Sequence, residues 1–126
     1  MVVLDACVLI ANFENDVHAT KAANVLDTED ALTLHPLTLS ECAVGASRTR
    51  RLDVLRGNIQ RLGADVWQPD PEHWFRVGAL RAATGLSLPD CCVLEAARTL
   101  VASLATFDLQ LAKAAKSMGI PVDDGS

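Results

Sequence analysis

Short apolar segments that read as strands alternate along this chain with longer segments that read as amphipathic helices. Residues 2–4 and 100–105 are the clearest strand candidates, while residues 19–26 repeat small apolar side chains at helical spacing. Such alternation predicts a parallel sheet covered by helices, which is an α/β fold. The chain has 126 residues, half of them apolar, and this fits a single domain over residues 1–126.

Four acidic residues stand where a strand-like or loop segment runs into a helix-like segment. They are Asp5, Glu41, Asp90 and Asp108. Ligands of parallel α/β sheets bind beyond the carboxyl ends of the strands, where Asp5 and Asp108 are expected. Carboxylates gathered at one edge repel each other, so a fold that collects them normally holds a hard divalent cation. The four positions therefore predict one metal site assembled from distant parts of the chain.

Each acid taken alone has a simpler structural explanation, because helix starts favour acidic side chains. Asp5, Asp90 and Asp108 fit N-cap positions, and Glu41 stands three residues after Thr38, the spacing of a capping box. Only the combination of all four favours metal chemistry over helix capping.

Four short segments carry a resemblance to a known family. They are VLDACVLI at residues 3–10, LSE at 39–41, LPD at 88–90 and LATFDL at 104–109. In order and spacing they resemble PIN-domain ribonucleases of the VapC toxin type, and the match runs through the full length of the chain. One departure is Cys7, where such proteins more often have Ser, Thr or Asn.

The resemblance implies a PIN-like α/β/α sandwich with a small, mainly parallel central sheet flanked by helices. It implies that Asp5, Glu41, Asp90 and Asp108 are both the catalytic residues and the ligands of Mg²⁺ or Mn²⁺, with Thr106 as a supporting polar residue. Oxygen ligands suit these hard cations, and a bound cation can activate water for attack on a phosphodiester. The expected activity is a metal-dependent endoribonuclease that hydrolyses RNA, the toxin of a type II toxin–antitoxin module.

The same resemblance suggests two protein partners. One is a cognate antitoxin whose C-terminal segment lies across the acidic site and presents an Arg to the carboxylates. The other is a second copy of the chain, since Ala-rich apolar helices early in the sequence can leave a patch for a homodimer.

Basic residues gather in the middle of the chain. Arg48, Arg50 and Arg51 are adjacent or nearly so, and they are candidates for contacts with RNA phosphates. A solvated helix surface explains them equally well. The formal net charge of −5 argues against a general polyanion binder, but four of the acids are assigned to the metal site.

Two other functions remain open from the residues. A phosphatase that forms an aspartyl-phosphate would also use Asp5 and Mg²⁺, but it needs a second Asp where Cys7 stands. A PIN-like module that binds RNA or protein without cleaving it would keep the fold, and loss of an acid would favour it. All four acids are present.

The thiols, imidazoles and aromatic rings give weaker signals. The cysteines lack zinc-site spacing, and we expect small, partly buried core residues at positions 7, 42, 91 and 92. His18, His35 and His73 are expected at the surface or at helix ends, and the few aromatic residues are expected to pack rather than to stack on bases. No segment reaches membrane-spanning length, so a cytoplasmic protein is expected, with a frayed tail at residues 123–126.

Overall fold

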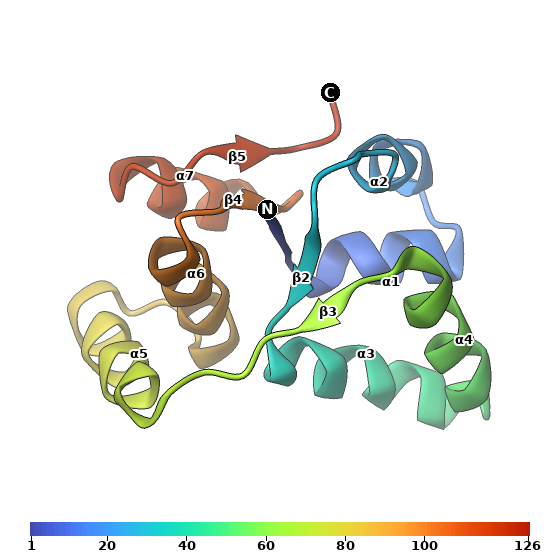
Figure 1. The fold of residues 1–126 in the computed structure, drawn as a ribbon, viewed down its shortest axis with the longest axis horizontal. Helices are drawn as coiled ribbons and strands as arrows, with labels where there is room; N and C mark the ends of the chain where they lie inside the picture. The colour runs from blue at the N-terminus through green and yellow to red at the C-terminus, as the bar shows by residue number, and fades with distance from the viewer.

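A five-stranded sheet with only parallel pairings forms the centre of the molecule. The structure is a computed structural model that describes residues 1–126. The strands are β1 (Val2–Leu4), β2 (Leu32–Leu34), β3 (Asp65–Val66), β4 (Ser103–Ala105) and β5 (Val122–Asp123). Their order in the sheet is β3-β2-β1-β4-β5, so β1 is the central strand (Figure 1). The predicted parallel α/β fold is confirmed.

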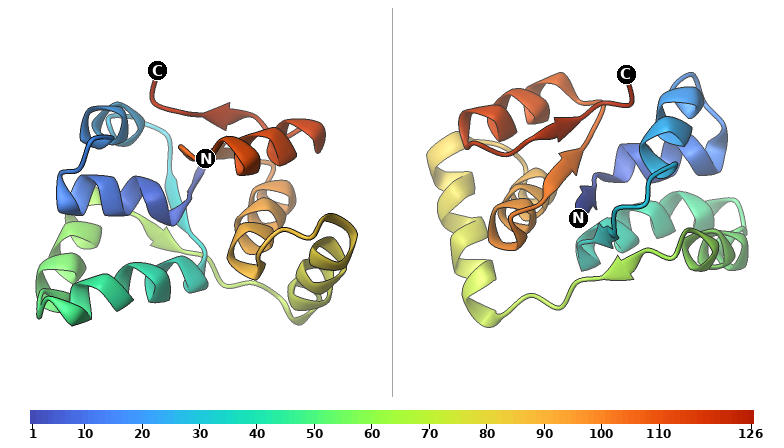
Figure 2. Two further views of the ribbon diagram at one scale, coloured as in Figure 1. Left: turned by 180° about the vertical axis from the view of Figure 1, so that it is seen from behind. Right: turned by 45° about the horizontal axis from the view of Figure 1, so that its top comes forward.

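Seven helices cover the two faces of this sheet. They are α1 (Ala6–Glu14), α2 (Ala19–Leu26), α3 (Pro36–Arg48), α4 (Leu52–Leu62), α5 (Pro71–Thr84), α6 (Leu88–Leu100) and α7 (Leu109–Ser117). Figures 1 and 2 show α1 to α4 on one side of the strands and α5 to α7 on the other. The helix–sheet–helix layers agree with the predicted α/β/α sandwich.

Strand β1 connects two hydrophobic cores of equal size. Val2 and Leu4 belong to a cluster of 14 buried residues with α1 to α4, whereas Val3 belongs to a second cluster of 14 with α5 to α7. Side chains of a strand alternate between the two faces of a sheet, and an all-parallel sheet is covered on both faces. Asp5 therefore follows a strand that is fixed from both sides.

Helix boundaries follow local capping chemistry. The Asp70 side chain accepts a hydrogen bond from the His73 N–H at the start of α5, Pro71 occupies the first turn, and Gly85 ends the helix with a φ of 72°. Gly63 ends α4 in the same left-handed conformation, with a φ of 66°. These ends agree with the sequence pattern.

Helix α6 is longer than the sequence indicated, so the prediction of a strand over residues 100–105 is partly wrong. The helix continues to Leu100 and ends at Val101, whose φ of 52° lies in the left-handed region. Only Ser103–Ala105 forms the strand. Residues 91–97 of α6 are all buried, and a helix buried on every side carries no polar stripe to mark where it stops.

The capping box that would have explained Glu41 without a metal does not form. Helix α3 starts at Pro36 and its N-cap is His35, whose side chain accepts a hydrogen bond from the Leu37 N–H at 3.0 Å. Thr38 lies inside the first turn and is buried. Glu41 consequently lies in the second turn of α3, where it satisfies no backbone N–H, and capping does not explain its presence.

The C-terminal residues are docked rather than frayed, contrary to expectation. Asp123 accepts a backbone hydrogen bond from Thr106 at 3.1 Å, and the Asn24 side chain of α2 donates to the Gly125 carbonyl at 2.9 Å. A Cβ on Gly125 would come within 2.3 Å of the Lys21 carbonyl oxygen, so only glycine fits against α2 here. In Figure 1 the C-terminus lies between β5 and α2.

No single helix is long and apolar enough to cross a membrane. Helices α5 and α6 reach that length and composition only as a pair, bent by 119° at their connection.

Candidate active site

Asp5 lies at the carboxyl end of the central strand, where its side chain accepts three hydrogen bonds. The Ala6 N–H donates to Asp5 Oδ1 at 2.9 Å. Asp5 Oδ2 accepts from the Thr106 hydroxyl at 2.8 Å and from the Cys7 thiol at 3.1 Å. Partners that fix the orientation of a carboxylate in this way resemble the groups that orient metal ligands in proteins.

Thr106 occupies the corresponding position after β4, the neighbour of β1 in the sheet. Its side chain is buried, and its hydroxyl accepts a hydrogen bond from the Asp108 N–H at 3.1 Å while donating to Asp5. One hydroxyl therefore joins two of the predicted acids. The structure places Thr106 where a supporting residue would act.

Asp108 is the N-cap of α7. Its Oδ1 accepts from the N–H groups of Gln110 and Leu111 at 2.9 and 3.1 Å. Both bonds use the same oxygen, which leaves Oδ2 without a backbone partner. An N-cap carboxylate is also favoured by the positive end of the helix dipole, so helix α7 fixes the place of Asp108 at this edge.

Helices α3 and α6 bring Glu41 and Asp90 to the same edge. Burial raises the pKa of Glu41, and the nearby charges of Asp5 and Asp90 raise it further. Burial also raises the pKa of Asp90, with further contributions from Asp5 and Asp108. Asp5 thus repels Glu41 and Asp90, and Asp90 also repels Glu41 and Asp108, although no three of these carboxylates lie within 4.8 Å of one another; such repulsion costs free energy unless a cation offsets the charge.

The donor set of this edge fits a hard divalent cation. All four predicted ligands offer carboxylate oxygen, which Mg²⁺ and Mn²⁺ prefer. Cys7 is the thiol that is hydrogen-bonded to Asp5, and burial together with the Asp5 charge raises its pKa to about 12. The thiol stays protonated at neutral pH and acts as a hydrogen-bond donor to Asp5, in the role that a hydroxyl or amide would otherwise take.

A sequence profile of the PIN domain matches residues 2–117. The chain belongs to the PIN domain family. No curated protein sequence matches the chain significantly.

Solved structures support the fold of this PIN domain. A toxin–antitoxin complex from Klebsiella pneumoniae aligns with a TM-score of 0.80 and 22% identity, over 100% of this chain and 98% of that chain. VapC20 from Mycobacterium tuberculosis, described as a toxin that cleaves the sarcin–ricin loop, aligns with a TM-score of 0.73 and 11% identity over 90% and 95% of the two chains. VapBC2 from Rickettsia felis, bound to a promoter DNA fragment, aligns with a TM-score of 0.71 and 13% identity over 97% of each chain.

The three arginines predicted to contact RNA lie away from the carboxylate edge of the PIN domain. Arg48 ends α3, seven residues after Glu41, which corresponds to about 10 Å along a helix. Arg51 lies 3.6 Å from Glu14 and 4.2 Å from the centre of the Phe13 ring, so its guanidinium already has two partners. Arg50 is exposed beside it. The structure brings the four acids together but not these arginines with them.

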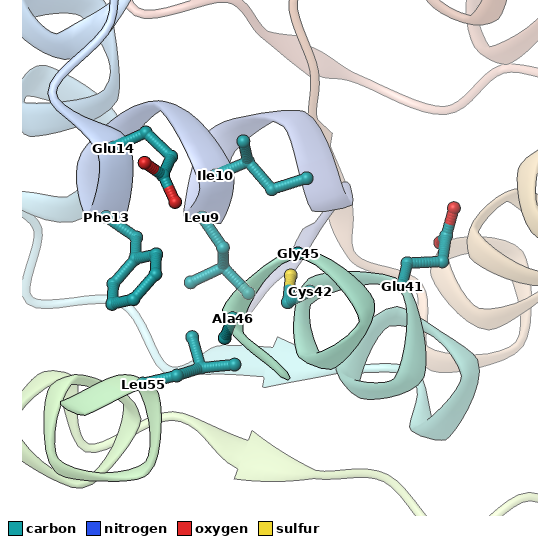
Figure 3. A pocket seen from close by; sticks show the side chains of 9 residues that line it. All are labelled: Leu9, Ile10, Phe13, Glu14, Glu41, Cys42, Gly45, Ala46 and Leu55. Atoms are coloured by element: carbon teal, nitrogen blue, oxygen red, sulfur yellow. The ribbon is translucent and has the colours of Figure 1, made fainter. Parts of the chain in front are cut away.

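An apolar groove leads away from Glu41 between α1, α3 and α4. Figure 3 shows Glu41 at one end of it and Glu14 at the other. Its walls are Leu9, Ile10, Phe13, Cys42, Gly45, Ala46 and Leu55. No sequence pattern indicated this groove, because its walls come from three helices and resemble ordinary core positions.

A second pocket lies on the other side of the site, beside Asp108. It is formed by α2, the connection from β4 to α7, α7 and β5, and it contains His18, Lys21 and Lys116. The His18 ring stacks on Phe107, with 5.2 Å between ring centres and 26° between planes. None of these basic residues was predicted as functional, since they are isolated in the sequence.

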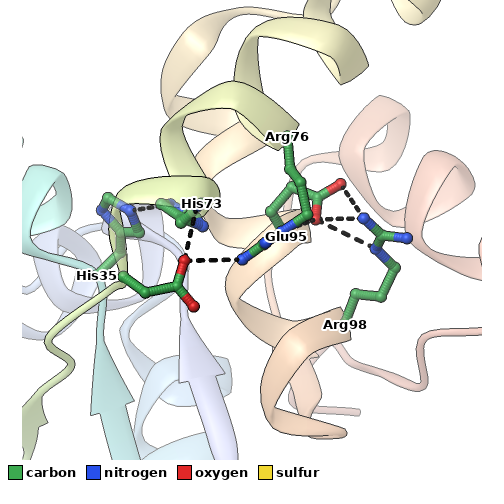
Figure 4. A network of polar contacts seen from close by, with 6 residues as sticks. His35, His73, Arg76, Glu95 and Arg98 are labelled. Carbon is green, nitrogen blue, oxygen red and sulfur yellow. Dashed lines mark hydrogen bonds and ion pairs between the residues drawn. The ribbon is translucent and has the colours of Figure 1, made fainter.

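Two buried histidines form a contact next to the acidic edge. His35 Nε2 and His73 Nε2 are 2.8 Å apart, and both side chains are fully buried (Figure 4). His35 and His73 lie at helix ends as expected, but not at the surface. With Cys92 they make the one group of three His, Cys, Asp or Glu ligand atoms that lie within 4.8 Å of each other.

The helix cap of α3 argues against a metal ion at these histidines. His35 Nδ1 accepts from the Leu37 N–H, so the proton of its neutral ring is on Nε2 and donates to His73 Nε2. Metal binding through His35 Nε2 would require either the loss of that cap or an imidazolate. Burial lowers the pKa of His35 to about 4 and lowers that of His73 as well. The pair is therefore a neutral structural contact between α3 and α5.

A buried carboxylate nearby also has a structural role. Glu95 of α6 is only 2% exposed, and Arg98 binds it through two nitrogens, the closer at 2.6 Å, while Arg76 of α5 lies 3.8 Å away (Figure 4). A charge that is paired on two sides is satisfied without a metal. Glu95 is thus distinct from the four acids, which face each other.

The remaining thiols agree with the prediction of core residues. Cys42, Cys91 and Cys92 are buried and Cys7 is half-buried, and none forms a disulfide. Burial raises the pKa of Cys42 to about 12 and of Cys92 to about 11, so neither thiol is poised for nucleophilic catalysis.

Proposed function

We propose that this PIN domain is a Mg²⁺- or Mn²⁺-dependent endoribonuclease that acts as the toxin of a type II toxin–antitoxin module. The observation that supports it is the meeting of Asp5, Glu41, Asp90 and Asp108 at the carboxyl edge of the sheet, where burial and mutual repulsion raise the pKa of two of them. A charge cluster with no protein cation to balance it favours a bound metal.

The surroundings of each acidic residue indicate its role in the proposed reaction. Asp5 and Asp108 are fixed by hydrogen bonds and serve as oriented ligands, with Thr106 holding them together. Asp90 completes the set. A bound divalent cation supplies an activated water and offsets negative charge on the phosphodiester. Glu41, whose pKa is raised, would either complete the ligand set or act through water as the acid/base.

The experiment that tests the activity uses the purified, partner-free protein with total RNA and Mg²⁺ or Mn²⁺. New 5′ ends are mapped by sequencing, alongside an EDTA control and the Asp90→Asn variant. One or a few sharp cleavage sites that disappear in both controls support the proposal. If cleavage persists in Asp90→Asn, the four acids are not the active site of a nuclease.

A PIN-like module that binds without cleaving is the second candidate. It becomes the better description if the well-folded protein cleaves no RNA from several sources but still binds RNA or a partner protein. The presence of all four acids favours the nuclease.

The apolar groove supports an antitoxin as the protein partner. Several solved structures with this fold are complexes of a toxin with its antitoxin. We propose that an apolar antitoxin segment occupies the groove and that a cationic side chain from it reaches Glu41 at the groove's end. Ile10→Glu, in the groove, should weaken the complex with a co-expressed antitoxin far more than Val44→Glu, on the exposed face of α3.

We propose that the protein works as a homodimer in the cytoplasm. Trp74 and Phe75 on α5 are 49% and 73% exposed, which is unusual for large aromatic side chains and suits an interface. Four free thiols suit a reducing compartment. Light scattering during gel filtration should give twice the chain mass, and Phe75→Lys should shift it toward the monomer.

A further inference from the structure

We propose that the pocket beside Asp108 is an RNA subsite, in which Lys21 and Lys116 contact a phosphate next to the cleaved one and the His18–Phe107 stack receives a base. This inference rests on the nuclease activity proposed above. It assigns substrate binding to a different face from Arg48, Arg50 and Arg51.

The pocket shares residues with the catalytic edge. Thr106 and Asp108 line both, and Phe107 lies between them in the chain. The Phe107 N–H donates to Cys7 Sγ at 3.4 Å, which ties this residue to the hydrogen bonds around Asp5. A strand of RNA whose phosphate lies at the four acids must continue over a neighbouring surface, and this pocket begins at one of those acids.

Charge also favours a phosphate in this pocket. The chain has only three lysines, Lys21, Lys113 and Lys116, and two of them line the pocket. Neither forms an ion pair, whereas Arg51, Arg56, Arg76 and Arg98 are all bound to carboxylates. A lysine without a protein anion is free to neutralise a phosphate.

One anion competes with the phosphate. Asp124 also lines the pocket, and the Lys21 charge helps to lower the pKa of Asp124, after the hydrogen bonds from Ser126. Asp124 lies beyond ion-pair distance of Lys21. With a metal at the acidic edge the charge of Asp108 would be offset, and Asp124 would be the one carboxylate of the lining left against the two lysines.

The stacked rings offer a surface for a base. Exposed His18 lies over half-buried Phe107, and bases of single-stranded nucleic acids stack on such rings whatever their sequence. The wall that carries His18 and Lys21 is held in place, because the C-terminal residues bind α2 through Asn24 and Gly125. The pocket is therefore preformed.

The test measures RNA binding separately from cleavage. The probe is a fluorescein-labelled, single-stranded RNA decamer of mixed sequence, followed by anisotropy in EDTA and in Ca²⁺ over a range of salt concentrations. Lys21→Ala/Lys116→Ala should weaken binding on the order of tenfold at low salt and reduce the salt slope by about 1.4, the value for two lost phosphate contacts on a single strand. Lys113→Ala, on another face of α7, is the matched control and should change affinity less than about twofold.

Two further variants separate stacking from charge. His18→Ala should weaken binding roughly fivefold or more, and His18→Phe should restore it, since a flat ring is what the base needs. Asp124→Asn should strengthen binding, because it removes the competing anion. These three results together support the subsite.

Each failure has a distinct meaning. If the double lysine variant binds RNA as the Lys113→Ala control does while the wild type cleaves RNA, the subsite is wrong and the nuclease stands. If the lysines affect antitoxin binding but not RNA binding, the pocket belongs to the partner protein and the subsite is again wrong. If the wild type neither binds nor cleaves RNA, both proposals fall.

Discussion

Asp5 and His35 occupy the same position on neighbouring strands, yet the fold treats them in opposite ways. Each is the first residue after its strand, β1 for Asp5 and β2 for His35. Asp5 remains half-exposed among three other acids, whereas His35 is fully buried against His73 of α5. The difference lies in what covers the strand end.

This contrast shows where a PIN domain can accept polar groups. A histidine can be buried as a neutral ring that donates one hydrogen bond and accepts another, at little electrostatic cost. A cluster of carboxylates has no such option, because protonation would remove the ligands that a metal needs. Stability is therefore built at the end of β2, and the proposed chemistry lies at the ends of β1 and β4.

The most severe test of this division is Asp5→Asn. The change removes a charge and keeps the side-chain size, so we expect RNA cleavage to fall at least about 100-fold, more than for loss of a group that only orients a ligand. The melting temperature should stay constant or rise, because repulsion on Glu41 and Asp90 decreases. Asp53→Asn, at an exposed acid paired with Arg56, is the control and should cleave normally. Unchanged cleavage in Asp5→Asn would place the chemistry elsewhere.

The two strand ends should also respond to pH with opposite sign. The pKa of His35 falls from 6.5 to about 4 on folding, so the unfolded chain binds more protons in that range and stability is lost as pH falls from about 6.5 to 4. The loss amounts to about 3 kcal/mol for this shift. The pKa values of Glu41 and Asp90 are raised on folding, so their protonation adds stability as pH falls.

Urea unfolding between pH 4.5 and 8 separates these two contributions. In Asp5→Asn the pKa values of Glu41 and Asp90 are raised less, so their protonation adds less unfolding free energy at low pH. The unfolding free energy should therefore fall more steeply toward low pH than in the wild type. Parallel pH profiles for the two proteins would show that the acids do not interact as the fold indicates.

A smaller effect is expected from His73→Leu. Without its acceptor, the His35 Nε2–H is buried and unpartnered, which costs about 1–3 kcal/mol of unfolding free energy, and loss of the buried His73 Nδ1–H, which has no partner in the wild type, offsets part of this cost. Metal binding at the acidic edge should persist in the folded variant, as measured by the rise in melting temperature on adding Mn²⁺. Glu72→Gln, exposed on the same turn of α5, should change stability by less than about 0.5 kcal/mol. Equal effects of the two changes would contradict a structural role for the histidine pair.

The smallest change belongs to Cys7→Ser. Serine keeps a donor to Asp5 Oδ2, so cleavage should stay within about threefold of the wild type, since the hydrogen bond is replaced rather than removed. In the wild type, iodoacetamide should react slowly with Cys7 at pH 7, because the pKa of this thiol is raised to about 12. Rapid alkylation of Cys7 in the folded protein would show that the thiol is not held as a donor.

The sequence predicted the parts of the site that depend on strand ends. Asp5 was recognisable because a short β-branched strand precedes it, and Asp108 because it starts a helix soon after one. For Glu41 the reasoning from the sequence does not match the structure. The residue lies within α3 and caps nothing. The sequence placed it where a loop runs into a helix, and the family resemblance then gave it a role in the site.

Contacts between distant segments were beyond prediction. The His35–His73 contact spans 38 residues, and the pocket beside Asp108 joins Lys21 of α2 to Lys116 of α7. Neither leaves a period or a motif in the sequence. The end of α6 was misplaced for another reason: the apolar residues Leu100, Val101 and Ala102 connect the helix to the strand without a glycine, and Val101 takes the left-handed position instead.

The central position of β1 sets the order in which this molecule can become active during synthesis. The groove between α1, α3 and α4 needs only residues up to Leu62, whereas Asp5 meets Thr106 across 101 residues of chain. From Leu62 to Asp108 the ribosome adds 46 residues, which takes roughly 2–9 s at ~5–20 residues per second. The groove residues of a growing chain are therefore synthesised several seconds before its last carboxylate. The proposed antitoxin can then bind before the active site is complete, so that inhibition precedes toxicity.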